Sequence, residues 1–232
     1  MPLATDIFKG SFIASPEELA KKLQHIKAYI FDWDGVFNDA HKSLDQTSSY
    51  SETDSMGINL LRFAHYLKQR HSAPVAIITG EQNKVAFGFA QREHFNAVYY
   101  KIKHKETALL HFCKANNLHP SEVLFVFDDA LDFSAAKIAG LRIMVDHSCN
   151  PLLVEYAKKN KLVDYLTAHD GEHGAVRESS ELIMFLNDIF DISLDHRAAY
   201  SKEYVSYFTK RNEQTTDFYT ILDNQITEQQ PL

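Results

Sequence analysis

The stretch Ala28–Ala40, AYIFDWDGVFNDA, sets three carboxylates directly after a short apolar run. The run AYIF is too short for a buried helix and is rich in β-prone residues, so it predicts a buried strand. Asp32 and Asp34 follow this strand at its carboxyl end, with Asp39 farther along the same loop. In open parallel sheets, ligands bind beyond the carboxyl ends of the strands. This stretch therefore predicts a core strand and, at its end, a place for chemistry.

Similar short runs recur along the chain and alternate with helical patterns. Strands are predicted at PVAIIT, NAVYY, EVLFVF and LRIMV, and helices at SPEELAKKLQHIK and near Gly57–Gln69, Gln82–Arg92, His104–Asn116 and Asp132–Ala139. Strands separated by helices imply right-handed crossovers and a parallel sheet that is covered on both faces. The predicted fold class is α/β, a Rossmann-like parallel sheet with helices on both faces.

The chain divides into three predicted parts. Residues 1–26 form an N-terminal helical extension, 27–190 the α/β domain, and 191–232 a helical and polar C-terminal extension. After about Asp191 the hydrophobic periodicity changes. The segment HRAAYSKEYVSYFTKR predicts one added amphipathic helix, and the polar segment after it has few core-forming residues.

Composition narrows the function classes. The formal charge of −7 argues against a nucleic-acid partner, which would require clustered Lys and Arg. The two cysteines, Cys113 and Cys149, form no CxxC pair, so neither a disulfide framework nor a zinc site is predicted. The most apolar late run, LIMFLNDIF, is broken by Asn187 and Asp188, which argues against a membrane span. We expect a cytoplasmic protein with no membrane partner and a small-molecule substrate.

Polar residues follow several other predicted strands at the same edge of the sheet. Thr79 and Gly80 follow VAII, Lys105 opens the helix after AVYY, and the acidic residues Asp128, Asp129 and Asp132 follow VLFV. Each feature alone has an ordinary explanation as a turn, a helix cap or a solvated side chain. Their convergence on one edge is the signature of a functional site.

These motifs resemble those of the haloacid dehalogenase superfamily of phosphohydrolases. DWDGV resembles its first motif, IITG its second, Lys105 its third and FDDALD its fourth. The segments DSMGINLL, HKETALL and GEHGAVRE resemble a branch without a large cap domain that dephosphorylates keto-deoxy sugar acids, octulosonate 8-phosphate and nonulosonate 9-phosphates among them. The resemblance covers about Ile26–Leu186 and implies a homo-oligomer, with a tetramer favoured.

The resemblance implies a role for each motif residue. A phosphate dianion repels a carboxylate nucleophile, so the chemistry needs a divalent cation and a cradle for the phosphoryl oxygens. Asp32 is the implied nucleophile, and Asp34 the acid and base. The implied Mg²⁺ ligands are Asp32, the backbone carbonyl of Asp34, and Asp128. Thr79, Gly80 and Lys105 are implied to hold the phosphoryl group, and Asp129 and Asp132 to orient the lysine or a metal-bound water.

Several positions depart from the pattern. Phe127 stands where the fourth motif has glycine, and Phe89 stands where the branch has a basic residue. Glu81 occupies the position of an arginine in the octulosonate enzymes, and a buried carboxylate there would repel a substrate carboxylate. We therefore expect a nonulosonate 9-phosphate-like substrate, with His104 and Arg177 as further substrate contacts.

Other function classes fit less well. Response-regulator receivers place their acidic pair before the nucleophile and the lysine last, whereas here the acidic cluster comes last. A glycosyltransferase DxD motif would leave Thr79 and Lys105 without a role. The remaining alternative is a phosphatase-derived binding or scaffolding module without catalysis, associated with sugar-acid metabolism. It is favoured by Phe127, Glu81, Phe89 and the added C-terminal segment.

Overall fold

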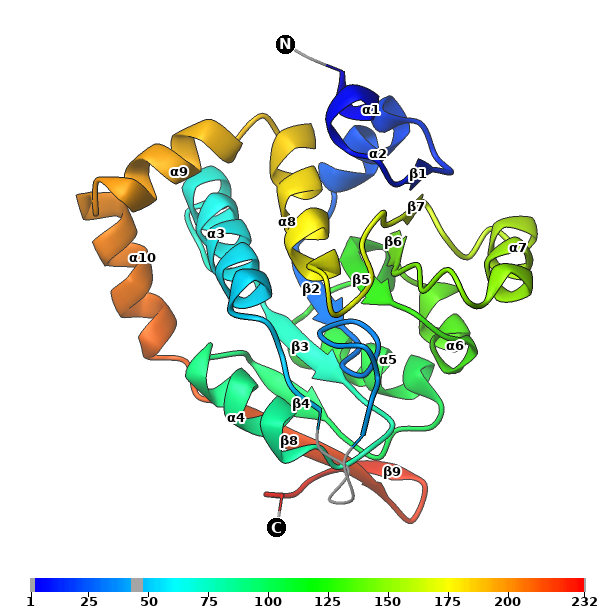
Figure 1. Cartoon of the computed structure of the whole chain (residues 1–232). Coiled ribbons are helices and arrows are strands. Elements are labelled where there is room, and N and C mark those ends of the chain that lie inside the picture. The colour runs from blue at the N-terminus through cyan, green and yellow to red at the C-terminus, as the bar shows by residue number, and fades with distance from the viewer. Residues whose placement is uncertain (1–2, 43–47, 232) are drawn as a thin grey trace.

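The computed structural model describes residues 3–42 and 48–231, and across these residues nine strands form one sheet in the order β1-β7-β6-β5-β2-β3-β4-β8-β9 (Figure 1). The strands are β1 Ser11–Phe12, β2 Ala28–Phe31, β3 Val75–Ile78, β4 Ala97–Tyr99, β5 Val123–Phe127, β6 Leu141–Met144, β7 Tyr165–Leu166, β8 Asp217–Leu222 and β9 Gln225–Glu228. All neighbouring strands from β7 to β8 run parallel, and β1 and β9 pair antiparallel at the two edges.

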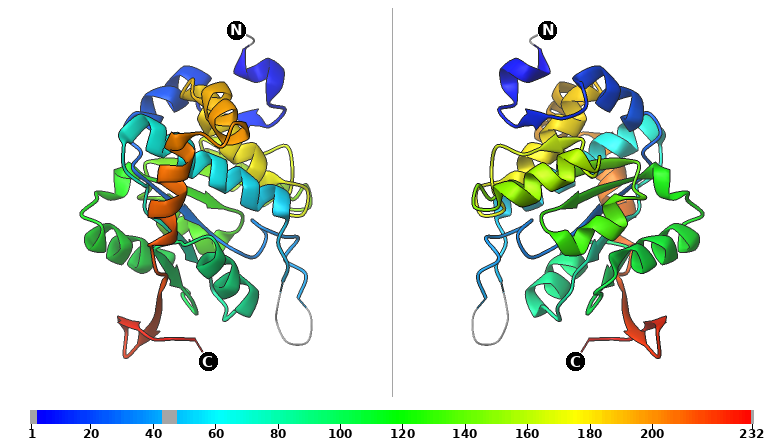
Figure 2. Two further views of the ribbon diagram at one scale, coloured as in Figure 1. Left: turned by 90° about the vertical axis from the view of Figure 1, so that its left-hand side faces the viewer. Right: turned by 90° about the vertical axis from the view of Figure 1, so that its right-hand side faces the viewer.

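Helices cover both faces of this sheet, as the two side views in Figure 2 show. The helices are α1 Ala4–Ile7, α2 Pro16–Leu23, α3 Glu52–Gln69, α4 Lys84–Arg92, α5 Lys105–Ala115, α6 Phe133–Ala136, α7 Pro151–Lys159, α8 Ala175–Leu186, α9 Phe190–Ala198 and α10 Lys202–Asn212, with 3₁₀ turns η1 Pro120–Glu122 and η2 Ala130–Asp132. Buried residues of α2, α3, α4, α8 and α10 share one hydrophobic cluster, and those of α5, α6 and α7 share the other. The predicted α/β class and the five predicted strands are confirmed.

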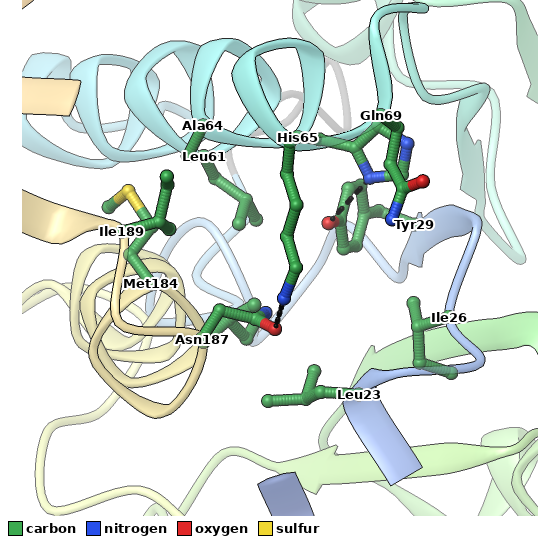
Figure 3. A pocket seen from close by; sticks show the side chains of 12 residues that line it. Leu23, Ile26, Tyr29, Leu61, Ala64, His65, Gln69, Met184, Asn187 and Ile189 are labelled. Atoms are coloured by element: carbon green, nitrogen blue, oxygen red, sulfur yellow. Dashed lines mark hydrogen bonds between the residues drawn. The ribbon is translucent and has the colours of Figure 1, made fainter. Parts of the chain in front are cut away.

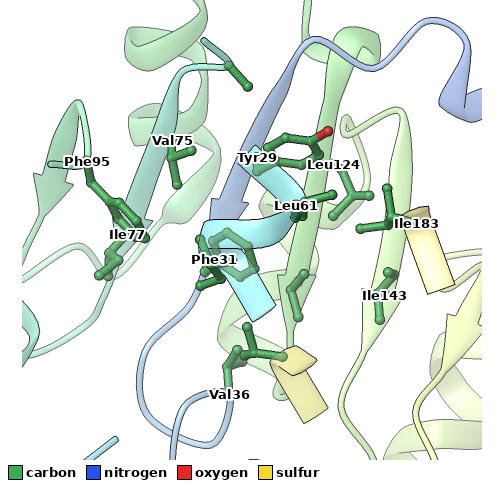
Figure 4. Packing of buried hydrophobic residues seen from close by; sticks show 14 of the residues in the cluster. Tyr29, Phe31, Val36, Leu61, Val75, Ile77, Phe95, Leu124, Ile143 and Ile183 are labelled. Atoms are coloured by element: carbon green, nitrogen blue, oxygen red, sulfur yellow. The ribbon is translucent and has the colours of Figure 1, made fainter. Parts of the chain in front are cut away.

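Alternating side chains on the central strands build the two cores. Tyr29 and Phe31 of β2 point to the α3 and α8 side, while Ala28 and Ile30 point to the α5 side. Figure 4 shows members of the first set, among them Tyr29, Phe31 and Leu61 of α3. Burying a large apolar side chain contributes about 1.5–3 kcal/mol to the stability of the fold, so the side chains of the central strands stabilise the packing of the sheet against its helices. The chain leaves this core directly after β2, where the next residue is the carboxylate Asp32.

The register of β2 sets which strand ends meet. Phe31, its last residue, pairs with Ile77 of β3 on one side and with Val126 of β5 on the other. The residues that follow these strands therefore emerge at the same edge. In the connection after β2, residues 32–42 and 48–51 form neither helix nor strand, so in the described part of this connection no cap domain covers that edge.

The terminal segments extend the sheet. Strand β1 pairs with β7, and β8 adds to the outer side of β4. The single helix predicted after Asp191 is two helices, because Tyr200 adopts a left-handed backbone with φ 49° and Ser201 then caps α10. Tyr207 of α10 is buried with its ring 5.4 Å from that of Phe63 in α3. The extension packs on the domain, and the division at residues 26 and 190 stays a prediction.

None of the described helices is long and apolar enough to cross a membrane.

Candidate active site

Four elements bring charged and polar side chains to the carboxyl edge of the sheet. Asp32 follows β2, Thr79 follows β3, Asp128 follows β5, and Lys105 is the first residue of α5, which follows β4. Because β2 lies between β3 and β5, Asp32 takes the central position. Asp32, Thr79, Lys105 and Asp128 are all buried. Residues that are 23 to 96 positions apart in the sequence thus form one cluster, as the strand-end argument predicts.

Lys105 is the buried cation of this cluster. Its Nζ lies 2.5 Å from Oδ1 of Asp32 and 2.5 Å from Oδ1 of Asp132, and its side chain is only 2% exposed. Burial opposes the charged ammonium, but the carboxylates of Asp132 and Asp32 outweigh it, so the pKa of Lys105 is raised. Burial, and then the neighbouring Asp132 charge, raises the pKa of Asp32 well above its usual range despite Lys105. The lysine is held ionised and aimed at the predicted nucleophile.

A cation fits beside these carboxylates. Oxygen atoms of Asp32, Asp128 and Asp132 lie within 4.8 Å of one another. Three carboxylates and one ammonium leave two negative charges uncompensated, and one divalent cation would offset them. An all-oxygen set of this kind suits Mg²⁺. Asp132 joins Asp32 and Asp128 in this group, whereas the predicted role of the Asp34 carbonyl stays a prediction.

Gly35 allows Asp128 to approach the nucleophile loop. Its φ is +83°, and a Cβ at this position would lie 2.0 Å from Oδ2 of Asp128. Only glycine satisfies both the left-handed backbone and the close contact. Nε2 of His147 lies 3.1 Å from the same oxygen, and this hydrogen bond raises the pKa of His147. Asp128 is therefore fixed from two sides.

Asp34 sits in a different environment from Asp32. Its Oδ1 accepts a hydrogen bond of 2.8 Å from the hydroxyl of Ser48, and its Oδ2 lies 3.0 Å from Nζ of Lys42. The carboxylate is 18% exposed, and Lys42 and Ser48 also line a hollow of about 530 Å³ that includes His41 and Glu172. A partly exposed carboxylate beside a hollow is placed to exchange a proton with a bound molecule.

The second predicted motif forms the turn after β3. Thr79 is fully buried, and its Oγ1 accepts a hydrogen bond of 3.3 Å from the backbone N–H of Glu81. A Cβ on Gly80 would meet no atom closer than 3.9 Å, so the backbone there is open to a ligand. Glu81 is exposed, and the side chain of His104, the residue at the N-cap position of α5, is 67% exposed. The premise of a buried Glu81 carboxylate is wrong, because water solvates this side chain.

Two other predicted residues have different partners. Nε of Arg177 donates a hydrogen bond of 2.6 Å to Glu181, one turn along α8. Arg177 lines a separate hollow with Phe8 and Lys9 from the N-terminal segment. The exposed Asp129 caps η2, where its Oδ1 accepts a hydrogen bond from the backbone of Ala130. Their roles in substrate binding and in support of the site stay predictions.

The two unusual phenylalanines fill the cores. Phe127 is fully buried and stacks on Phe125 at 5.5 Å between ring centroids, on the α5 side of the sheet. Phe89 packs on the other side, 5.5 Å from Trp33 and 4.7 Å from Tyr50. Neither ring takes the place of an acidic residue of the cluster. Phe127 is compatible with the position of Asp128.

The cavity drawn in Figure 3 lies away from these carboxylates. It has a volume of about 20 Å³ and is lined by residues from the start of β2, the second half of α3 and the end of α8, with Tyr29 hydrogen-bonded to His65 and Lys68 to Asn187. Such a volume admits about one water molecule. It is too small for a sugar-acid phosphate.

Sequence reasoning missed Ser48, His147 and Lys42. His147 follows β6 by three residues, so the strand-end rule that found Asp128 could have found it too. Lys42 and Ser48 lie in the described segments 32–42 and 48–51, which form neither helix nor strand, and nothing in the sequence marks them. Their place beside Asp34 is visible only in three dimensions.

No protein-family model matches the chain. The chain is 25% identical over 178 residues to the 3-deoxy-D-manno-octulosonate 8-phosphate phosphatase of Escherichia coli, a match that covers 75% of this chain and 87% of the relative. A Legionella pneumophila protein described as a HAD superfamily (subfamily III A) hydrolase matches in structure with a TM-score of 0.66 at 28% identity, over 79% of this chain and 95% of that one.

A second solved structure adds ligands to the comparison. It is the 3-deoxy-D-manno-octulosonate 8-phosphate phosphatase of Moraxella catarrhalis in complex with a magnesium ion, a phosphate ion and a KDO molecule. It matches with a TM-score of 0.65 at 27% identity, over 77% of this chain and 97% of that one. The matches in sequence and structure agree with the four strand-end motifs and with the absence of a cap in the described connection after β2. The chain is thus similar in sequence and in fold to phosphatases of the haloacid dehalogenase superfamily.

Proposed function

We propose that this chain is a Mg²⁺-dependent phosphomonoesterase that transfers a phosphoryl group from its substrate to Asp32 and then to water. The observation that carries the proposal is the buried ion pair of Lys105 with Asp32 and Asp132, next to Asp128. Three buried carboxylates around one ammonium are costly unless the site binds a further cation. The metal ion that accompanies a phosphate dianion is such a cation.

The first step forms a bond between a carboxylate oxygen of Asp32 and phosphorus. The ester O–P bond breaks, and the leaving oxygen takes its electron pair and the proton of Asp34. In the second step Asp34 takes a proton from water, the water oxygen attacks phosphorus, and the O–P bond to Asp32 breaks to release phosphate. Both steps use one nucleophile and one acid and base in alternation.

The remaining residues hold the phosphoryl group. The Lys105 ammonium, the Thr79 hydroxyl and the Gly80 amide neutralise or bind its oxygens as charge moves onto them. Mg²⁺, when bound by Asp32 and Asp128 with the Asp34 carbonyl, supplies further charge neutralisation and keeps Asp32 ionised. Asp132 fixes Lys105 by their 2.5 Å ion pair.

For the substrate we propose a phosphorylated keto-deoxy sugar acid. The relatives from Escherichia coli and Moraxella catarrhalis are named as octulosonate 8-phosphate phosphatases. The hollow of about 530 Å³ beside Asp34 has room for a sugar acid, and Lys42 at its wall is a cation that suits a carboxylate. We favour a nonulosonate 9-phosphate, because Glu81 stands in place of the arginine of the octulosonate enzymes.

The test is phosphate release from para-nitrophenyl phosphate with and without Mg²⁺. We expect metal-dependent turnover that Asp32→Asn removes, and turnover by Asp32→Asn equal to the wild type would refute the role of Asp32. A panel of octulosonate 8-phosphate and nonulosonate 9-phosphates then identifies the substrate. Equal kcat/KM on all of them would contradict Glu81 as a selector.

The assembly and location are proposed from the same resemblance. We expect a homotetramer in the cytoplasm, with subunit contacts that screen the open edge of the sheet. Light scattering coupled to size-exclusion chromatography measures the mass, and a monomer at assay concentration would contradict the tetramer. We favour the enzyme over the scaffolding alternative, because Phe127 and Phe89 are core residues and Asp32, Asp128 and Asp132 form the acidic cluster.

A further inference from the structure

Ser48 joins three elements at one buried hydroxyl. Nε1 of Trp33 lies 3.0 Å from its Oγ, Nδ2 of Asn83 lies 2.7 Å from it, and Oδ1 of Asp34 lies 2.8 Å from it. Ser48 is 6% exposed, and Trp33 and Asn83 are fully buried. The Ser48 hydroxyl therefore forms its hydrogen bonds with these protein groups rather than with bulk water.

The direction of each hydrogen bond follows from the donors. An indole N–H only donates, so Trp33 donates to Ser48. The orientation of the Asn83 amide is fixed, because its Oδ1 accepts hydrogen bonds from the backbone N–H groups of Val85 and Ala86 as the N-cap of α4. Its NH₂ group must then face Ser48 and donate as well.

A serine hydroxyl has two acceptor lone pairs and one hydrogen. Trp33 and Asn83 occupy both lone pairs, so the hydrogen has one remaining partner, Oδ1 of Asp34. When Asp34 is protonated, that oxygen is already an acceptor, and the proton lies on Oδ2. Nζ of Lys42 lies 3.0 Å from Oδ2, and because an ammonium only donates, this partly exposed side chain must turn toward solvent or substrate when Oδ2 carries the proton.

We propose that Ser48 is a positioning residue that directs the Asp34 proton onto Oδ2 and aims that oxygen at the leaving group. This inference rests on the proposed function, since it assigns how the acid of that reaction is oriented. The rigid donors make the device specific: Trp33 is stacked on Phe37 at 4.8 Å, and Asn83 is held by the first turn of α4.

The test compares two esters with leaving groups of different acidity. Para-nitrophenolate leaves readily without a proton, whereas the alkoxide of benzyl phosphate needs one from Asp34. With Mg²⁺ present, we expect Ser48→Ala to lower kcat/KM on benzyl phosphate by roughly tenfold more than on para-nitrophenyl phosphate, a fraction of what a general acid contributes. A role in holding the loop alone would lower both values by the same factor.

Asn83→Asp is the second variant. Asp is as good an N-cap as Asn, so α4 keeps its cap, but the new carboxylate accepts the Ser48 hydrogen in competition with Asp34. We expect the same selective loss on benzyl phosphate. Ser193→Ala is the matched control, because Ser193 is a buried serine of α9 whose hydroxyl donates to the backbone of Ile189, the N-cap residue of that helix. We expect this variant to leave the ratio of the two kcat/KM values unchanged.

Selective loss in both variants supports the inference. Equal losses on the two esters in Ser48→Ala, or a wild-type ratio in Asn83→Asp, overturn it. A wild-type chain that hydrolyses neither ester overturns the proposed function and this inference together. Wild-type turnover combined with equal losses overturns the inference alone.

Discussion

Replacing Lys105 with methionine removes the buried cation and keeps most of the side-chain volume. The Lys105 Nζ lies 2.5 Å from each of two carboxylates, and at an effective dielectric constant near 20 each such pair is worth about 7 kcal/mol before desolvation. Desolvation of the charged groups offsets much of this. Breaking a buried pair by removing one partner costs about 3–5 kcal/mol, because the other charge stays buried. We expect Lys105→Met to lower the free energy of unfolding by that amount.

The assay is urea unfolding near pH 7 with a chelator present. Lys68→Met is the control, because Lys68 is exposed and binds the side chain of Asn187, and we expect a change within about 0.5 kcal/mol. The double variant Lys105→Met with Asp132→Asn removes one of the stranded charges. It should be more stable than the sum of the single effects by about 1 kcal/mol or more. Additive effects, or a loss below about 1 kcal/mol in Lys105→Met, would refute the reasoning.

Two further predictions concern single residues. Gly35→Ala places a Cβ 2.0 Å from Oδ2 of Asp128, so Mg²⁺ affinity measured by calorimetry should fall about tenfold or more, whereas Gly88→Ala, with no atom within 4 Å, leaves it unchanged. Equal affinities of the two variants would contradict the close contact. Burial raises the pKa of Asp54, which accepts a 2.7 Å hydrogen bond from the backbone of Arg177, to about 6. The Asp54 carboxyl binds a proton more tightly in the folded chain than in the unfolded chain, where its pKa is the usual 3.8. The contribution of Asp54 to the free energy of unfolding therefore falls as the pH rises from 3.8 to about 6. Asp54→Asn keeps a hydrogen-bond acceptor but cannot ionise. In urea unfolding, the free energy of unfolding of the variant relative to the wild type should rise by about 1–3 kcal/mol between about pH 4 and about pH 7. The same difference between variant and wild type at both pH values would contradict this.

Local patterns identified the strands and helices of the core. The runs AYIF, VAII and VLFV are apolar at every position because both faces of the sheet are covered, and this pattern is visible without a structure. Strands β8 and β9 were missed because they lie at the edge of the sheet, where polar side chains are tolerated. The break between α9 and α10 was missed because it depends on the backbone of one residue, Tyr200.

The candidate site likewise contains residues that the sequence predicts and residues that it does not. Asp32, Thr79, Lys105 and Asp128 follow from the rule that parallel strand ends meet, so sequence predicts that they lie together. Asp132 was assigned a role in orienting Lys105 or a metal-bound water, and it lies as close to Lys105 as Asp32 does. The prediction that Glu81 is buried was wrong, because the exposure of this side chain depends on how the turn after β3 packs against its neighbours. Ser48 lies in the segment 48–51, which forms neither helix nor strand, so no hydrophobic periodicity marks its position.

The central claim is that Asp32 accepts the phosphoryl group. The most direct measurement is acid quenching during turnover with Mg²⁺, followed by mass spectrometry of the peptide that contains Asp32. The account predicts an added mass of one phosphoryl group on Asp32, which Asp32→Asn does not show. A phosphoryl group on another residue of the quenched wild-type enzyme would contradict it.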